Sequence, residues 1–161
     1  MLATTTDPAK LPLLSGRGAL PVDTASDDLV AQAMRATGGA GVDLVVDHVG
    51  GALLDDLVAA AGLGATIIQV GRLGGRRAAL DLDRLAYRRV RLVGTTFRTR
   101  RGAEHRAAIA ADLRERLLPA IASGRVRAHV HEVFPADRAD AARDLLRGGG
   151  ATGKVVLSYG G

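Results

Sequence analysis

Short apolar runs alternate along the chain with longer segments in which apolar residues recur every three or four positions. The short runs predict β-strands, and the period near 3.6 predicts helices that bury one face. The predicted strands lie at residues 1–5, 19–22, 42–47, 65–71, 90–98, 126–134 and 154–159. The predicted helices lie at residues 7–16, 25–39, 52–62, 103–124 and 135–149, and a loop with a short helical turn covers 72–88.

The helix boundaries are marked by residues that satisfy or remove terminal backbone groups. Asp7 is expected to cap the first helix, with Pro8 at its first helical position. The second helix is expected to begin near Ser26 and to end at the glycine pair that follows it. Pro119 lies inside the long fourth helix and is expected to bend it.

Strands that alternate with helices predict βαβ units and a parallel sheet. The runs "DLVVD" and "TIIQV" are almost continuously aliphatic, as expected for parallel strands that are covered on both faces. The first of them belongs to "GVDLVVDHVGG" at residues 41–51, which predicts a buried strand ending in a tight glycine turn. Such a turn could hold a phosphate, present a catalytic side chain, or form the corner of an α/β unit.

The composition limits the chemistry that the chain can perform. Its 161 residues are about one domain's worth, and 47% of them are hydrophobic, so a core can form. The absence of cysteine excludes disulfides, cysteine-ligated zinc and a cysteine nucleophile. Since no apolar run reaches the length of a membrane span and the first residues lack a signal pattern, we expect a cytoplasmic protein that does not bind membranes.

The chain is basic, with a formal net charge of +5, and only two of its 22 basic residues are lysine. Ten arginines fall between Arg72 and Arg101, against only Asp81 and Asp83. Such a segment could bind a nucleic-acid backbone. Because aromatic residues make up only 2% of the chain, few rings could stack on bases, and a solvated or subunit-facing basic surface is favoured.

Seven sequence blocks occur in an order that identifies a family. They are "TTTDPAKL…GRGA", "GGAGVDLVVDHVGG", "IIQVGRLGG", "LVGTTFRTR", "LLPAIASGRV", "VFPADRADAARDLL" and "TGKVVL". In this order the chain resembles the C-terminal half of quinone oxidoreductases, a zinc-free branch of the medium-chain dehydrogenase/reductase superfamily, whose members include zinc-binding dehydrogenases. The resemblance covers nearly the whole chain.

The resemblance implies an α/β fold that is a partial Rossmann domain. The doubly wound parallel sheet would lack its first βα unit, which holds the central strand and the glycine-rich phosphate turn. Residues 1–124 would form the partial dinucleotide-binding domain, and residues 125–161 a strand–helix–strand segment that in relatives packs on a GroES-like catalytic domain. A G-x-G-x-x-G match at Gly148 to Gly153 follows a helix and precedes a strand, so we interpret it as a helix stop.

The implied activity is NADPH-dependent hydride transfer to a quinone or another conjugated carbonyl. The resemblance assigns no catalytic side chain in this chain, and half of the substrate pocket would lie outside it. We therefore expect the polypeptide alone to have little activity. The alternatives are a basic nucleic-acid-binding fragment and a purely structural or dimerising one.

Three residues at the end of the first predicted strand and just beyond it occupy positions that, by the resemblance, select the cofactor. An acid here would bind the ribose 2′-hydroxyl of NADH, but the resemblance places Thr5 at this position, beside Thr6. Lys10 lies where relatives direct a lysine toward a 2′-phosphate, so NADPH is favoured over NADH. The tyrosine that many relatives carry after the third Rossmann strand is absent. The alternative is that the threonines only end a strand and Lys10 is solvated.

Five residues would lie beside the ribose and nicotinamide at the carboxyl ends of two strands. The resemblance places His48, Val49 and Gly50 by the ribose, and Val70 and Gly71 by the nicotinamide. Histidine is a common general base at physiological pH, but hydride transfer to a quinone needs no base at His48. We interpret this stretch as a structural turn with one side chain facing the cofactor.

Three further residues complete the implied cofactor site. Thr96 and Phe97 would lie near the carboxamide, and Lys154 would reach toward the pyrophosphate. The alternatives are plain packing for Phe97 and a solvated position for Lys154. His129 and His131 point to one face of a strand, but no third ligand lies nearby, so no metal is expected.

The implied partners are a small quinone or enone substrate and a second copy of the chain. The strand from Val90 to Phe97 resembles the edge through which relatives pair their sheets into homodimers. An unpaired strand edge of this kind is a template for pairing with another chain.

Overall fold

The computed structural model of the protein describes residues 1–96, 99 and 102–160. The chain divides into two compact units, Met1–Thr99 and Arg100–Gly161, and each is described by itself. The division precedes the long helix, whereas the predicted domain boundary follows it at residue 124. That boundary concerned the way relatives are organised, and it stays a prediction.

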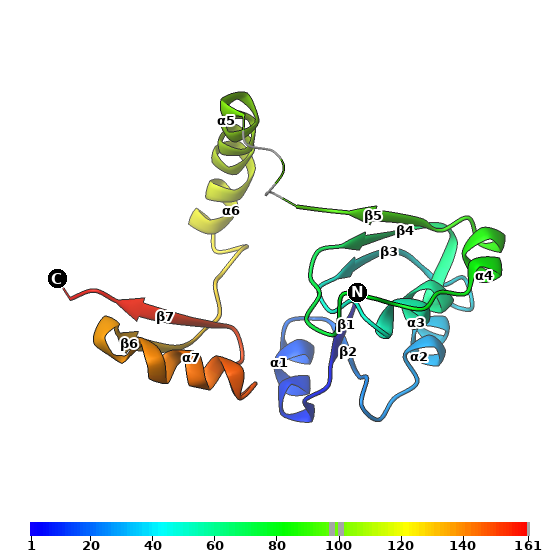
Figure 1. Ribbon diagram of the computed structural model, residues 1–161, viewed down its shortest axis with the longest axis horizontal. Helices are drawn as coiled ribbons and strands as arrows, with labels where there is room; N and C mark the ends of the chain where they lie inside the picture. The colour runs from blue at the N-terminus through cyan, green and yellow to red at the C-terminus, as the bar shows by residue number, and fades with distance from the viewer. Residues whose placement is uncertain (97–98, 100–101, 161) are drawn as a thin grey trace. The chain divides into compact units, whose positions relative to one another are not determined.

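The first unit begins with two parallel strands, β1 (Leu2–Thr5) and β2 (Leu20–Asp23). They are joined by a short 3-10 turn η1 (Pro8–Lys10) and a helix α1 (Leu11–Gly16) (Figure 1). Asp7 accepts a hydrogen bond from the N–H of Ala9 and Pro8 follows it, so the predicted cap is confirmed.

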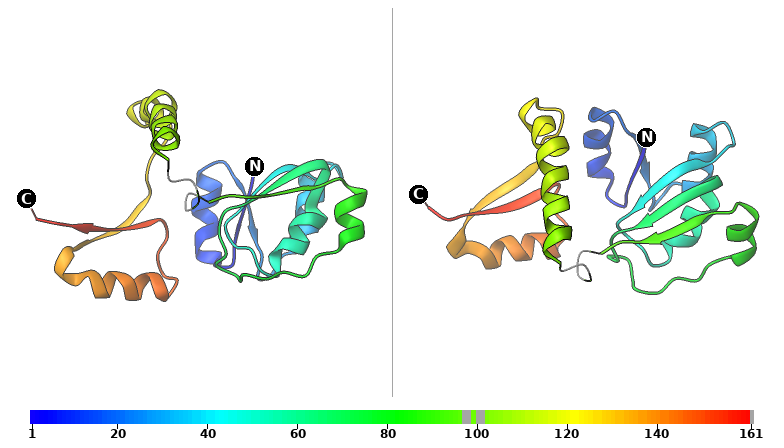
Figure 2. Two further views of the ribbon diagram at one scale, coloured as in Figure 1. Left: turned by 45° about the horizontal axis from the view of Figure 1, so that its top comes forward. Right: turned by 90° about the horizontal axis from the view of Figure 1, so that it is seen from above.

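The second sheet of this unit holds three parallel strands, β3 (Val42–Asp47), β4 (Ala61–Gln69) and β5 (Arg91–Gly94), in that order. Figure 2 shows them side by side in both views. The connecting helices are α2 (Leu29–Ala36), α3 (Leu53–Ala60) and α4 (Leu82–Tyr87). All of these elements were predicted, but β4 begins four residues earlier than expected, directly at the end of α3.

The predicted start of the second helix near Ser26 is wrong by about one turn. α2 begins at Leu29, and Asp28 is its N-cap, accepting from the N–H of Ala31 at 2.9 Å. The Ser26 hydroxyl instead donates to the carboxylate of Asp23, at 3.0 Å. Ser26 therefore closes the turn after β2, a role that the local sequence pattern does not separate from capping.

The two sheets of the first unit match a doubly wound fold with an interruption. In the strand order 3-2-1-4-5-6, β2 and β1 correspond to the first two strands and β3, β4 and β5 to the last three. Among the described residues, no strand lies between β1 and β3. The fold is thus a partial Rossmann-like α/β fold, as the sequence predicts.

The core of the first unit lies on one face of the β3–β4–β5 sheet. Val22, Val58 and Ile67 are fully buried, and Val45 packs against them. Side chains alternate across a strand, so the neighbours of Val45 point to the other face. There Leu44 and Val46 remain 58% and 54% exposed.

The second unit begins with a continuous helical segment. It consists of α5 (Ala103–Asp112), a π-helical turn η2 (Leu113–Leu117) and α6 (Leu118–Ala122). Pro119 has no N–H to donate, and the π turn directly precedes it, with the N–H of Leu118 bonded to the carbonyl of Leu113. A widened turn thus lies directly before Pro119, and the bend predicted there stays a prediction.

The rest of the second unit is a parallel βαβ unit, with β6 (Val130–Pro135), η3 (Ala136–Arg138), α7 (Ala139–Arg147) and β7 (Lys154–Ser158) (Figure 1). Phe134 is the most buried side chain of β6. α7 ends at Arg147, with Gly148 as its C-cap, so the G-x-G-x-x-G match is a helix stop, as predicted. Within the described ranges, no helix is long and apolar enough to cross a membrane.

Candidate functional site

The end of β1 is a closed turn held by polar contacts. The N–H of Asp7 donates to the Thr5 hydroxyl at 3.1 Å, and the N–H of Thr24, after β2, donates to the Thr5 carbonyl at 2.8 Å. Thr6 is exposed in the same turn. The turn thus brings the predicted residues Thr5, Thr6 and Lys10 to the carboxyl end of β1, where ligands bind in open α/β sheets.

Lys10 forms an ion pair with Asp7 in this turn. Its Nζ lies 3.5 Å from Asp7 Oδ2, and their side chains are 25% and 41% exposed. An acid therefore lies beside the predicted 2′-phosphate position, although the residue placed at the acid position itself is Thr5. The signal was present in the i, i+3 spacing of Asp7 and Lys10, which places oppositely charged side chains together.

The turn after β3 is built around a buried carboxylate. Asp47 is only 2% exposed, and its Oδ1 accepts from the N–H groups of Val49, at 2.8 Å, and Gly50, at 2.9 Å. Gly50 and Gly51 have φ angles of 64° and 62°, which residues with a Cβ rarely adopt. The side chain of His48 is exposed on this turn.

The loop after β4 lies directly against that turn. The N–H groups of Val70 and Gly71 donate to the Asp47 carbonyl at 2.7 and 3.1 Å, and the N–H of Gly74 donates to the Val49 carbonyl at 2.8 Å. The structure therefore brings together all five residues predicted to lie beside the ribose and nicotinamide. Their roles toward a cofactor stay predictions.

Missing side chains allow this close packing of the two loops. A Cβ on Gly71 would overlap the His48 carbonyl, and one on Gly51 would overlap the Gly74 carbonyl. Gly50 and Gly75 form an isolated parallel bridge between the loops. The sequence shows the glycines, but their pairing joins residues more than twenty positions apart, and local patterns do not reveal it.

Asp47 also holds a polar atom without a partner. Its Oδ2 is buried and accepts no hydrogen bond from any of the described residues. Buried carboxylate oxygens are nearly always hydrogen-bonded in native proteins. An orphaned acceptor beneath a turn of Cβ-free residues fits a site that a polar group completes.

The remaining predicted residues fall outside this loop pair. The N–H of Thr95 donates to the Gln69 carbonyl at 3.1 Å, which places the exposed Thr96 just beyond the end of β5. Phe97 lies outside the described residues. Lys154 is the exposed first residue of β7 in the second unit, where its N–H donates to the His129 carbonyl at 2.8 Å.

His131 lies in β6, and His129 directly precedes this strand. His129 is half-buried and His131 is exposed. Over residues 1–96, 99 and 102–160, no group of three or more His, Cys, Asp or Glu side chains is arranged to hold a metal ion.

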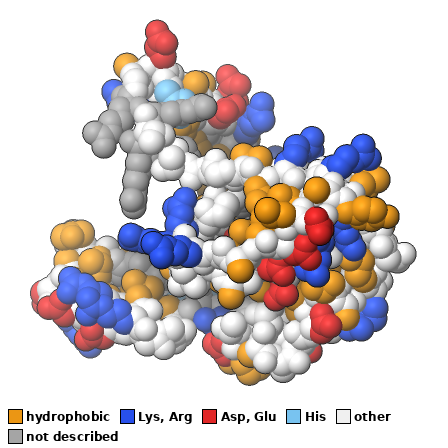
Figure 3. Space-filling model, turned by 45° about the vertical axis from the view of Figure 1, so that its right-hand side comes forward, with side chains coloured by type: hydrophobic (Ala, Val, Ile, Leu, Met, Phe, Trp, Pro, Cys, Tyr) orange, Lys and Arg blue, Asp and Glu red, His pale blue; other side chains and the backbone are white. Residues whose placement is uncertain are grey.

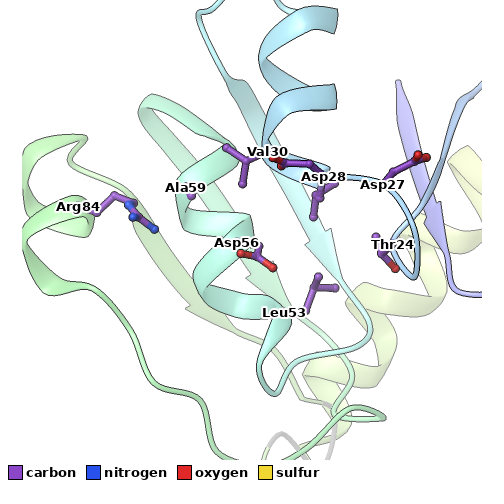
Figure 4. A pocket seen from close by; sticks show the side chains of 9 residues that line it. Thr24, Asp27, Asp28, Val30, Leu53, Asp56, Ala59 and Arg84 are labelled. Atoms are coloured by element: carbon purple, nitrogen blue, oxygen red, sulfur yellow. The ribbon is translucent and has the colours of Figure 1, made fainter.

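A cavity of about 480 Å³ lies elsewhere in the first unit, between α2, α3 and α4. Figure 4 shows Asp27 and Asp28 at the start of α2, and Asp56 on α3, among its lining side chains. Arg84 is the cation of this lining, and its guanidinium is paired with Asp55 and Asp81. The excess of carboxylates disfavours the phosphates of a dinucleotide here.

On the side of the molecule shown in Figure 3, Lys and Arg side chains are interspersed with acidic and apolar ones. Arg84 is ion-paired, and the guanidinium of Arg88 donates to the Ala59 carbonyl at 3.0 Å. These two arginines thus have structural partners within their own unit.

Parallel strands that carry glycine turns at their carboxyl ends define the fold as a partial Rossmann-like one. The model of the zinc-binding dehydrogenase family matches residues 18–157. The chain therefore belongs to the zinc-binding dehydrogenase family, within the medium-chain dehydrogenase/reductase superfamily, and the predicted resemblance is confirmed. A search of curated proteins found no match.

Solved structures of oxidoreductases share the fold. A mycobacterial protein in complex with NADPH is 27% identical, with a TM-score of 0.81; the match covers 98% of this chain and 49% of that one. An NAD-dependent alcohol dehydrogenase is 27% identical, with a TM-score of 0.78 and coverages of 99% and 43%. A quinone oxidoreductase of Pseudomonas syringae is 20% identical, with a TM-score of 0.81 and coverages of 98% and 48%.

The chain thus spans less than half the length of these structures. The family is one of dehydrogenases, one of these neighbours is in complex with NADPH and another is NAD-dependent. Although the family is named for zinc, the described residues bring together no group of three or more possible zinc ligands.

Proposed function

We propose that the protein forms the cofactor-binding part of an NADPH-dependent oxidoreductase of the quinone reductase type. The observation that carries this proposal is the pair of interlocked glycine turns after β3 and β4. The carboxyl ends of parallel strands meet at one edge of a sheet, and that edge binds ligands in doubly wound folds. The NADPH complex of the mycobacterial neighbour supports the choice of cofactor.

When bound, the nicotinamide supplies a hydride, which together with one proton reduces a quinone carbonyl system to the hydroquinone. The residues of this chain position the cofactor and exclude water from it. The Val49–Gly50 and Val70–Gly71 turns would lie beside the ribose and the ring, where their glycines would let the cofactor approach the backbone closely. Thr96, just beyond the end of β5, would orient the carboxamide.

The preference for NADPH rests on the turn after β1. A cation near the 2′ position favours a phosphate there over a hydroxyl group. Lys10 supplies this cation, and the exposed Thr6 supplies a hydroxyl donor that suits an ester dianion. The Thr5 hydroxyl is already engaged, since it donates to the Asp7 carbonyl.

Calorimetric titrations of the full chain with NADPH and with NADH test the proposal. We expect both dinucleotides to bind, NADPH more tightly, and Lys10→Gln to weaken NADPH binding while leaving NADH binding nearly unchanged. A quinone added to the NADPH complex should be reduced only slowly, since the chain spans less than half the length of the oxidoreductases that share its fold. Failure of both dinucleotides to bind at millimolar concentration would contradict the proposed function.

We also propose a homodimer through the β5 edge. Leu92 and Val93 are 41% and 44% exposed, and β5 is the last strand of its sheet, so its outer edge is open to pairing. Light scattering after size-exclusion should give twice the chain mass for the wild type. A proline at Leu92 removes an edge N–H and should yield the monomer; a monomeric wild type would refute the dimer.

A further inference from the structure

The turn after β1 presents two opposite charges. Lys10 Nζ lies 3.5 Å from Asp7 Oδ2, so the positive charge that would attract a 2′-phosphate is already paired with a carboxylate. Both side chains reach solvent, since they are 25% and 41% exposed. A ligand group approaching the end of β1 therefore meets both charges.

The backbone holds Asp7 in place. Its Oδ1 accepts from the N–H of Ala9 at 3.0 Å as the cap of η1, and its own N–H donates to the Thr5 hydroxyl at 3.1 Å. The hydroxyl of Thr5 in turn lies within hydrogen-bonding distance of the Asp7 carbonyl, at 3.4 Å. Because these contacts fix its backbone and one carboxylate oxygen, Asp7 cannot swing away from the strand end without losing its cap.

We infer that Asp7 is a specificity-determining residue that disfavours a 2′-phosphate and favours a 2′-hydroxyl. An acid just after this strand of a dinucleotide-binding domain accepts a hydrogen bond from the ribose hydroxyl, whereas a phosphate dianion beside it is repelled. The inference rests on the proposed function, since it concerns the same cofactor site. Asp7 thereby restrains the preference for NADPH that Lys10 creates.

Asp7→Asn tests the charge without removing the cap, because asparagine is as good an N-cap as aspartate. We expect the ratio of NADPH affinity to NADH affinity to rise about three- to tenfold in a low-salt buffer. Most of the change should appear in the NADPH dissociation constant. Added salt should reduce the change, because the charges are exposed to solvent.

Asp81→Asn is the matched control. Asp81 caps α4 through the N–H of Arg84 at 3.0 Å and pairs with the guanidinium of Arg84 at 3.7 Å, three residues on. Its side chain is 43% exposed, close to the 41% of Asp7. This variant removes the same charge from the same kind of cap away from β1, so the affinity ratio should stay at the wild-type value.

The outcomes separate the inference from the proposed function. Equal binding ratios in wild type and Asp7→Asn, with both dinucleotides bound, would overturn the inference alone, as would an equal rise in Asp81→Asn. Absence of dinucleotide binding by every variant would overturn the proposed function and the inference with it. Asp7→Ser, which also caps a helix, provides a second neutral variant and should show the same rise if Asp7→Asn does not fold.

Discussion

The turn after β1 and the loop pair after β3 and β4 are specified in opposite ways. The first depends on side chains: Asp7 caps, and Lys10 neutralises it. The second depends on their absence, because Gly51 and Gly71 lie against backbone carbonyls where a Cβ would overlap. A charge-built turn, one that charged side chains hold together, can therefore change its ligand preference when one of these side chains is substituted. A turn held by close backbone contacts tolerates almost no substitution of its glycines.

The largest expected effect is that of Gly51→Ala. The new Cβ would require an unfavourable φ and would overlap the Gly74 carbonyl, so we expect the free energy of unfolding to fall by about 3 kcal/mol. Gly64→Ala is the control, since Gly64 also has a positive φ but open space around it. Its expected loss is about 1 kcal/mol; equal losses in chemical denaturation would contradict the importance of the loop contact.

Asp47→Ala should have the next largest effect. It removes the acceptor of two N–H groups beneath the glycine turn, and we expect a loss of about 2 kcal/mol in the free energy of unfolding. Asp47→Asn keeps one acceptor oxygen and should lose less. The two variants can be ranked by thermal unfolding, and a smaller loss for alanine than for asparagine would show that the turn does not depend on these hydrogen bonds.

Asp7→Ala tests the charge-built turn in the same terms. It removes the cap of η1, and we expect a loss of about 1 kcal/mol in the free energy of unfolding. Asp7→Asn should restore most of that stability. If the two variants unfold at the same temperature, the cap contributes nothing, and the turn is held by the other contacts of Thr5.

The smallest expected effect is that of Lys10→Met on stability. Exposed ion pairs contribute little, so the free energy of unfolding should change by less than about 0.5 kcal/mol. A melt at low and at high salt measures this change. A loss as large as that of Asp7→Ala would mean that Lys10 stabilises the turn by more than its exposed charge.

The order of strands and helices could be predicted because periodicity and caps are local signals. Pro8 after Asp7 marked the start of the first helical segment, and the aliphatic run from Val42 to Asp47 marked β3. The start of α2 was misplaced because Ser26 and Asp28 have the same local preference, and the Asp23 carboxylate decides between them.

The candidate site was predicted only in part. His48 to Gly50, together with Val70 and Gly71, were expected at strand ends, and these residues lie together. The contact between the Gly51 and Gly74 loops and the orphaned oxygen of Asp47 depend on tertiary packing, so the sequence does not show them. The pairing of Asp7 with Lys10 could have been predicted from their spacing of three residues. From the sequence, Asp7 is explained by its capping role alone, and that role does not indicate what its charge does.

The interruption between β1 and β3 has a consequence for how the protein behaves in solution. No described strand pairs with the edge of β1 opposite β2 or with the edge of β3 opposite β4. The exposed side chains of Leu44 and Val46 make the sheet surface beside the β3 edge apolar. Unpaired backbone edges beside apolar surface are templates for intermolecular strand addition. Solubility should therefore fall steeply with protein concentration, and mild chaotropes that compete for backbone groups should keep the chain dispersed at concentrations where it otherwise precipitates.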